Sequence, residues 1–246
     1  MLVGAGILLS LHFSLFTLAE AQTDTVAARI IDRYLAILNI DALPQDSMLV
    51  LTTTITKQGG GDTVVMTRLF QKPQMFRVDV RDSHGLQTGL CSNGKDRFRA
   101  YPYQGDWWGD IKPEDFYNRL TGFDFRGPLY NWRMNGLELT YLGKVDVDHK
   151  GAKLDAVRVV TSTTYPRTYF FEESGLLCLI IEDEVMSDGI PVLKDTHINW
   201  KCEHEYGRVG ETVLPTLESF LRHGEQTVLS TEMHFEKRDN LRFNQD

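Results

Sequence analysis

Two histidines and a cysteine in the last quarter of the chain carry the side chains best suited to hold a metal ion. His197, Cys202 and His204 lie close together in sequence, and imidazole and thiolate are usual ligands of Zn²⁺ in proteins. On one strand, however, the odd spacing of His197 and Cys202 directs their side chains to opposite faces, and no second pair has zinc spacing. Glu203 and Glu205 fit a solvated strand end. The sequence therefore predicts no metal site.

Motifs of catalytic and nucleotide-binding sites are absent from the sequence. The chain contains no Gly-x-Ser-x-Gly, no P-loop, no Gly-x-Gly-x-x-Gly and no His-Glu-x-x-His. Its densest acidic group, Glu182-Asp183-Glu184, fits an exposed approach to a turn better than an acid/base pair. We expect no catalytic residue and no cofactor, although isolated His, Asp and Ser side chains can converge in a folded chain.

The overall charge excludes one class of partner. The 246 residues include 26 basic and 34 acidic ones, a formal net charge of −8. A general nucleic-acid binder needs a basic surface. We therefore expect no nucleic acid among the partners. The 42% hydrophobic and 24% charged residues are typical of a globular protein.

The N-terminal segment has the pattern of an export signal. It carries no ionised side chain from Leu2 to Ala19 and ends in Ala19-Glu20-Ala21, the small-x-small pattern of signal-peptidase sites. We predict a signal peptide at 1–21 and a mature chain at 22–246. No Lys or Arg precedes the apolar run, so either the α-amino group supplies the charge or the true start lies upstream. An uncleaved anchor is the alternative.

The three cysteines are predicted to be buried thiols. An odd number leaves at least one cysteine outside any intrachain disulfide. Cys178 and Cys202 flank the Asp188-Gly189 turn, where a simple hairpin would place Cys178 opposite Asn199. Cys202 is then about three residues out of register and beyond disulfide reach.

One amphipathic helix is predicted over residues 25–39. Val26, Ile30, Tyr34 and Leu38 form one row at a spacing of four, flanked by further apolar residues. The opposite side is charged, so the helix has one face to bury.

After residue 44 the hydrophobic period changes from 3.6 to 2, which is typical of strands with one wet face. Turn signals such as Asn93-Gly94 and Ser174-Gly175 separate the runs, and no linker or repeat divides the mature chain. These patterns predict one α+β domain, a strongly curved, open antiparallel sheet wrapped over a few helices. Predicted strands cover residues 49–55, 64–70, 76–80, 87–91, 96–101, 138–145, 154–161, 168–171, 176–182, 192–200 and 228–235.

Three stretches of this order resemble one family. Residues 68–80 are similar to a strand–basic–Pro–strand signature, and residues 90–103 to a hairpin with a polar-Gly-Lys turn. Residues 165–182 are similar to a hairpin with an acidic-x-x-Gly-Leu turn. Together they resemble the periplasmic lipoprotein carriers and the outer-membrane lipoprotein-sorting-like proteins, from about residue 26 to 243.

The resemblance implies an unclosed barrel of about eleven strands, with helices as a lid over bound lipoprotein acyl chains. It also implies a periplasmic location in a two-membrane bacterium and partners among the inner- and outer-membrane lipoprotein-sorting components. The best-known carriers have an arginine before the motif proline, whereas this chain has Lys72. Lysine lacks the planar fork of arginine, so a lid latch built on it would be weaker.

Six residues are candidates for the cavity or its lid, and each has a plainer alternative. Lys72 could hold a lid or a lipid head group, or be an exposed turn lysine. The tryptophan pair could line a cavity mouth or a membrane interface, or cap the core. The helix residues could cover a cavity or belong to ordinary core. The candidates are Lys72, Trp107, Trp108, Phe116, Leu120 and Phe123.

The leading hypothesis is a non-enzymatic periplasmic carrier of lipid or lipoprotein acyl chains. An acyl chain needs a covered site to cross water, since each exposed CH₂ costs about 0.8 kcal/mol. The alternative is a structural or sensory module on the same fold that binds a protein partner. An enzyme on this scaffold is a third class, since fold does not settle function.

Overall fold

The structure, a computed structural model, describes most of the chain beyond its N-terminal segment. The described residues are 25–42, 44, 47–60, 63–72, 75–92, 97–101, 109–110, 125–147, 153–160, 166–182, 186–187, 190–191, 200–222 and 224–237. Residues 1–21 lie outside this range, so the signal peptide stays a prediction. Among the described residues, none of the helices combines the length and the hydropathy needed to span a membrane.

The chain divides into two compact units. Unit 1 comprises Met1–Tyr34 and Arg133–His197, and unit 2 comprises Leu35–Trp132 and Ile198–Asp246. Each unit is described by itself below. A single domain over residues 22–246 stays a prediction.

The predicted N-terminal helix is confirmed over residues 25–38. Its buried stripe is centred on Ala27, Ile31, Tyr34 and Leu38, which are at most 5% exposed. Asn39 ends the helix in the left-handed conformation, with φ of 48°, which asparagine tolerates better than most residues.

Unit 1 contains a small antiparallel sheet with the strand order β10-β9-β8-β7. The β9–β10 hairpin turns at Gly175, whose φ of 91° favours glycine, as the Ser174-Gly175 signal predicts. A two-residue pair, β11 with β12, brackets Asp188-Gly189. The strands are β7 (Glu138–Asp146), β8 (Lys153–Val160), β9 (Arg167–Phe171), β10 (Leu177–Glu182), β11 (Met186–Ser187) and β12 (Ile190–Pro191).

The core of unit 1 is dense and apolar. Phe170, Leu179 and Ile181 cluster with Ala156, and partly buried side chains pack around them. Tyr34 of the helix meets Phe171 edge-on, with ring centroids 5.6 Å apart. Tyr34 of the helix therefore extends this core.

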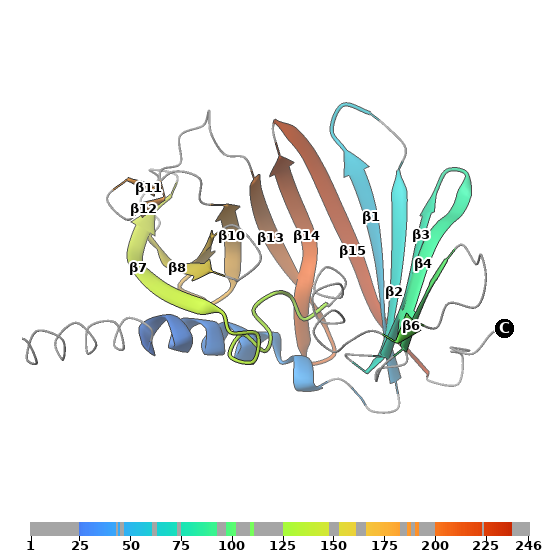
Figure 1. Ribbon diagram of the computed structural model, residues 1–246, viewed down its shortest axis with the longest axis horizontal. Helices are drawn as coiled ribbons and strands as arrows, with labels where there is room; N and C mark the ends of the chain where they lie inside the picture. The colour runs from blue at the N-terminus through green and yellow to red at the C-terminus, as the bar shows by residue number, and fades with distance from the viewer. Residues whose placement is uncertain are drawn as a thin grey trace, which may run out of the picture. The chain divides into compact units, whose positions relative to one another are not determined.

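Unit 2 contains a larger antiparallel sheet with the order β6-β5-β4-β3-β2-β1-β15-β14-β13. Figure 1 shows its long strands running side by side. A short 3₁₀ helix, η1 (Ile40–Ala42), leads into it. The strands are β1 (Ser47–Lys57), β2 (Val64–Lys72), β3 (Met75–Asp82), β4 (Gly85–Ser92), β5 (Arg97–Tyr101), β6 (Gly109–Asp110), β13 (Trp200–Val209), β14 (Thr212–Arg222) and β15 (Glu225–Lys237).

The β13–β14 hairpin differs from the prediction. The sequence analysis predicted a strand at residues 192–200 and none at 212–222. In the structure, Trp200–Val209 pairs with Thr212–Arg222. Pro215 weakens the sequence signal for the second strand, because proline within sheets is confined to bulges and edges. The register shift between Glu205 and Tyr206, where Tyr206 lies opposite Pro215, accommodates it. Residues 192–199 lie outside the described chain.

The predicted antiparallel, open sheet with an N-terminal helix is confirmed. The number of eleven strands and their wrapping over several helices stay predictions. The three cysteines form no disulfide, as expected, but only Cys202 is fully buried while Cys91 and Cys178 are half-buried.

Candidate functional site

The six residues proposed from sequence are mostly outside the described chain. Trp107, Trp108, Phe116, Leu120 and Phe123 fall there, so their roles stay predictions. Lys72 ends strand β2 opposite Met75, at a register shift in the β2–β3 hairpin. The two strands expected on either side of Lys72-Pro73 are therefore present and paired, and the role of Lys72 in a lid latch stays a prediction.

One face of the unit 2 sheet separates into a covered end and a half-covered end. We refer to it as the Phe70 face, since Phe70 lies on it together with its cross-strand neighbours Leu49 and Phe76, all 2% exposed. Phe125 covers this end, with its ring 4.4 Å from that of Phe70. Toward the other end the same face is apolar but only half-buried, at Ile55, Val64, Met66, Val80 and Leu229.

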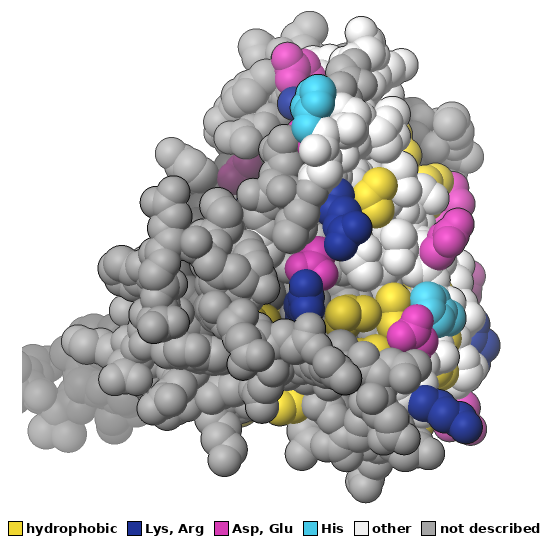
Figure 2. Space-filling view, turned by 90° about the vertical axis from the view of Figure 1, so that its right-hand side faces the viewer, with side chains coloured by type: hydrophobic (Ala, Val, Ile, Leu, Met, Phe, Trp, Pro, Cys, Tyr) yellow, Lys and Arg dark blue, Asp and Glu magenta, His cyan; other side chains and the backbone are white. Residues whose placement is uncertain are grey.

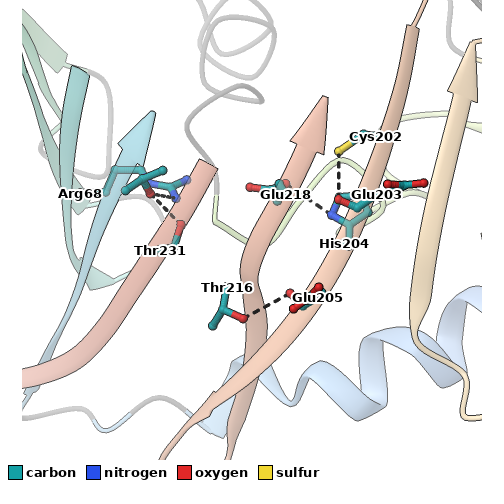
Figure 3. Close-up of polar contacts among 9 residues, drawn as sticks. Arg68, Cys202, Glu203, His204, Glu205, Thr216, Glu218 and Thr231 are labelled. Atoms are coloured by element: carbon teal, nitrogen blue, oxygen red, sulfur yellow. Dashed lines mark hydrogen bonds and ion pairs between the residues drawn. The ribbon is translucent and has the colours of Figure 1, made fainter. Parts of the chain in front are cut away.

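A polar cluster lies on this face between its two ends. Thr53 of β1 and Thr231 of β15 are directly paired, and their hydroxyl oxygens are 2.9 Å apart. Nη2 of Arg68, on β2, donates to Oγ1 of Thr53 at 3.1 Å. Figure 3 shows the side chains of Arg68 and Thr231 turned toward one another. The cluster places a cation among apolar neighbours.

The Arg68 guanidinium is incompletely satisfied. Its Nε is buried and donates no hydrogen bond. Burial lowers the pKa of Arg68 below its ordinary value, and the Glu218 carboxylate acts in the opposite direction. Arginine stays charged despite such a shift. Among the described residues, no acceptor pairs with this N–H, so a buried donor of a cation is available to an acceptor from outside them.

A second polar cluster lies on the same face, on β13 and β14. Cys202 and His204 are two positions apart on β13 and so share a face, and Glu218 of β14 lies directly opposite His204. Oε1 of Glu218 is 3.4 Å from Nδ1 of His204, as drawn in Figure 3. One ligand atom from each of Cys202, His204 and Glu218 lies within 4.8 Å of the others.

Sequence reasoning missed both clusters for the same reason. Arg68 and Thr53 lie on different strands, as do His204 and Glu218, so only the sheet register brings each pair together. The one local signal was Cys202-x-His204, whose spacing of two places both side chains on one face of a strand.

The opposite face of this sheet carries charged side chains on β3, although Met48 and Val50 of β1 are buried on it. Arg77 and Asp79 of β3 form an ion pair there, with 2.9 Å between Nε and Oδ2. Figure 2 views the molecule from the side where β1–β4 are drawn, and its described residues show basic and acidic side chains interspersed. Neither sign of charge forms a continuous patch among them, in keeping with a solvated surface.

Comparison with known proteins identifies the fold. No family profile and no curated protein match the chain in sequence. Solved structures match it over most of its length. A LolA superfamily protein from Nitrosomonas europaea matches with a TM-score of 0.56 at 14% identity, over 87% of this chain and 94% of its own.

Two further structures match with similar coverage. A DUF1329 family protein from Desulfovibrio piger matches with a TM-score of 0.53 at 13% identity, covering 88% of this chain and 95% of its own. A domain from Vibrio parahaemolyticus, described as an outer membrane lipoprotein-sorting protein, matches with a TM-score of 0.51 at 10% identity, covering 92% and 96%. The chain therefore has the fold of the LolA superfamily and of outer membrane lipoprotein-sorting domains over most of its length.

Proposed function

We propose that the protein is a non-enzymatic binder of lipid or lipoprotein acyl chains that carries them through the periplasm. The observation that supports this most is the Phe70 face, where a buried Arg68 N–H without an acceptor lies beside half-covered apolar side chains. An amphipathic ligand with an apolar tail and an oxygen-rich head matches both features.

The apolar part of this face suits an acyl chain. Ile55, Val64 and Leu229 lie in one cross-strand row over β15, β1 and β2. Each CH₂ of a ligand that leaves water for such a surface contributes about 0.8 kcal/mol. A chain of a dozen carbons then gains enough to offset the cost of being held in one orientation.

The polar cluster suits the head of the same ligand. Nε of Arg68 can donate to a carboxylate, phosphate or ester oxygen, and a charge-assisted hydrogen bond of this kind is stronger than a neutral one. A bound head group would satisfy a buried donor that otherwise carries a desolvation cost.

The sequence candidates complete the proposal. In a half-barrel of about eleven strands, Phe116, Leu120 and Phe123 would cover the tail as a lid, and Trp107 and Trp108 would line its mouth. Lys72 would hold the lid or the head group more weakly than an arginine. Lipoprotein-sorting components of the two membranes would be the donor and the acceptor.

Displacement of a fluorescent fatty acid tests this function with two charge substitutions on adjacent positions of β15. Leu229 lies on the Phe70 face and Ser230 on the opposite, exposed face. Leu229→Asp puts a carboxylate against the tail, so we expect affinity to fall at least about tenfold. Ser230→Asp adds the same charge to the other face and should leave affinity unchanged.

Two results would contradict the proposal. If the wild type and folded Leu229→Asp bind the fluorescent fatty acid with equal affinity, the acyl tail does not bind on the Phe70 face. Failure of the wild-type protein to bind any acyl probe would favour the alternative, a structural or sensory module with a protein partner.

A further inference from the structure

The pairing of β13 with β14 assembles three side chains that carry metal-binding atoms. Cys202 and His204 come from one strand, and Glu218 lies across from His204. Their side chains are sheltered, since Cys202 is 1% exposed and the side chains of His204 and Glu218 are 7% and 22% exposed. Thiolate, imidazole and carboxylate together are a donor set for Zn²⁺ or Co²⁺ rather than for Mg²⁺ or Ca²⁺.

The distances match a small, closed coordination shell. Around a tetrahedral Zn²⁺, with metal–ligand distances of about 2.0–2.3 Å, the ligand atoms lie about 3.3–3.8 Å from one another. Nδ1 of His204 and Oε1 of Glu218 are already 3.4 Å apart. The three donor atoms lie within 4.8 Å of one another. Side-chain rotations that move these atoms by about 1 Å would bring them to the separations of a zinc site.

His204 itself points to a missing ligand. Both of its ring nitrogens are buried, and neither makes a hydrogen bond with a residue that the structure describes. A buried imidazole without partners is costly, and nearly all buried polar atoms in proteins are satisfied. The contact with Glu218 does not relieve Nε2, because that carboxylate approaches Nδ1. A metal ion bound between Glu218 and His204 would satisfy Nδ1 and order the ring.

Neighbouring groups set the strength of such a site. Arg68 of β2 acts on Glu218 electrostatically and so competes with a cation for its charge. Sγ of Cys202 donates to the carbonyl oxygen of Glu203 at 3.8 Å, a weak contact that the thiolate gives up on metal binding. Glu203 and Glu205 are exposed on the opposite face, so they are not ligands.

We infer that Cys202, His204 and Glu218 form a transition-metal site that prefers Zn²⁺. Three protein ligands leave a fourth position for water or for an oxygen of a bound molecule. The site stands on its own geometry and is independent of lipid binding.

Titration of the purified, chelator-treated protein with Co²⁺, in the absence of lipid, tests the site. We expect one equivalent to bind and to produce a thiolate-to-cobalt charge-transfer band, which Zn²⁺ then abolishes. A Cys91→Ser/Cys178→Ser variant keeps Cys202 as its one cysteine and should give the same band. Absence of the band in the wild type and in this variant would overturn the inference.

Single substitutions of the three proposed ligands test whether the charge-transfer band arises from this site. Cys202→Ser should abolish it, and His204→Gln or Glu218→Gln should weaken Zn²⁺ binding more than about 100-fold, since even outer-shell partners contribute about 10- to 100-fold. Circular dichroism confirms that each variant is folded. A band that persists in Cys202→Ser would place the metal at another cysteine and would contradict the site.

Discussion

The core of unit 1 and the Phe70 face of unit 2 are both built on antiparallel strands, but they differ in how completely their side chains are buried. In unit 1, β9 and β10 are buried almost throughout, and Phe170 and Ile181 are 1% and 4% exposed. In unit 2, the Phe70 face is fully buried around Leu49 and Phe70 but not along its whole length, although other side chains of this unit, such as Leu214, are buried as well. Further along the same face come half-buried aliphatic side chains and the buried donors of Arg68 and His204.

This difference indicates which surface is available for function. A dense apolar core contributes mainly stability. A face that keeps a cation and an imidazole without acceptors carries a cost that a packed core avoids. Such local inconsistency is expected where a protein binds something. We therefore place the candidate sites on the Phe70 face of unit 2 rather than in the apolar core of unit 1.

Truncation of Phe170 should give the largest effect. Phe170→Ala removes a ring packed among Leu179, Ile181 and Ala156 in unit 1, and we expect a loss of about 3–5 kcal/mol in the free energy of unfolding. Urea denaturation measures it. Met66→Ala, on the half-buried part of the Phe70 face, is the control with a smaller expected loss. Equal losses would show that the two regions are packed alike.

Phe116→Asp should affect binding more than folding. If Phe116 belongs to a lid, its replacement puts an unpaired carboxylate against an acyl tail, which should weaken binding of a fluorescent fatty acid by at least about 2 kcal/mol. A lid has fewer contacts than a core, so stability should fall less than in Phe170→Ala. Urea denaturation of both variants distinguishes a lid from a core. If Phe116→Asp lowers the free energy of unfolding as much as Phe170→Ala does, Phe116 belongs to the core and not to a lid.

Thr53→Val tests the polar cluster with little change of shape. The substitution leaves the Thr231 hydroxyl and Nη2 of Arg68 without their partner, at a cost of about 1–3 kcal/mol in the free energy of unfolding. The double variant Thr53→Val/Thr231→Val should be destabilised by less than the sum of the two single losses. Strict additivity would show that the two hydroxyls do not interact.

The smallest expected effect lies in unit 1 at high pH. Burial, reinforced by Asp155, raises the pKa of Tyr141 from 10.0 to about 12 in the folded protein. Its hydroxyl donates to Oδ1 of Asp155 at 2.7 Å. The associated stability is complete below pH 10.0 and is lost as the pH rises toward about 12. Tyr141→Phe should flatten this decline in urea denaturation, and an unchanged decline would contradict the assignment.

The sequence predicted the elements whose signals are local. Signals in neighbouring residues predicted the helix, the Gly175 turn and the alternation along β3, and the structure confirms them. The centre of the buried helix stripe is shifted by one residue from Val26 and Ile30 to Ala27 and Ile31. The resemblance in residues 68–80 likewise predicted the β2–β3 hairpin.

Features that depend on strand register could not be predicted. Strand β14, which contains Pro215, was not predicted. Without that strand, the sequence could not place Glu218 opposite His204. The Arg68–Thr53–Thr231 cluster joins the neighbouring strands β1 and β2 to β15, which is far from both in sequence. Long-range pairing of this kind leaves no periodic signal in a single chain.

Native mass spectrometry of the purified protein tests the central claim, that the Phe70 face of unit 2 binds acyl chains, most directly. We expect an additional mass, identified as an acyl-bearing species by fragmentation, that is retained in Ser230→Asp and lost in folded Leu229→Asp. Protein that carries no ligand, and that still gains none after incubation with fatty acid or lipoprotein, would contradict the account.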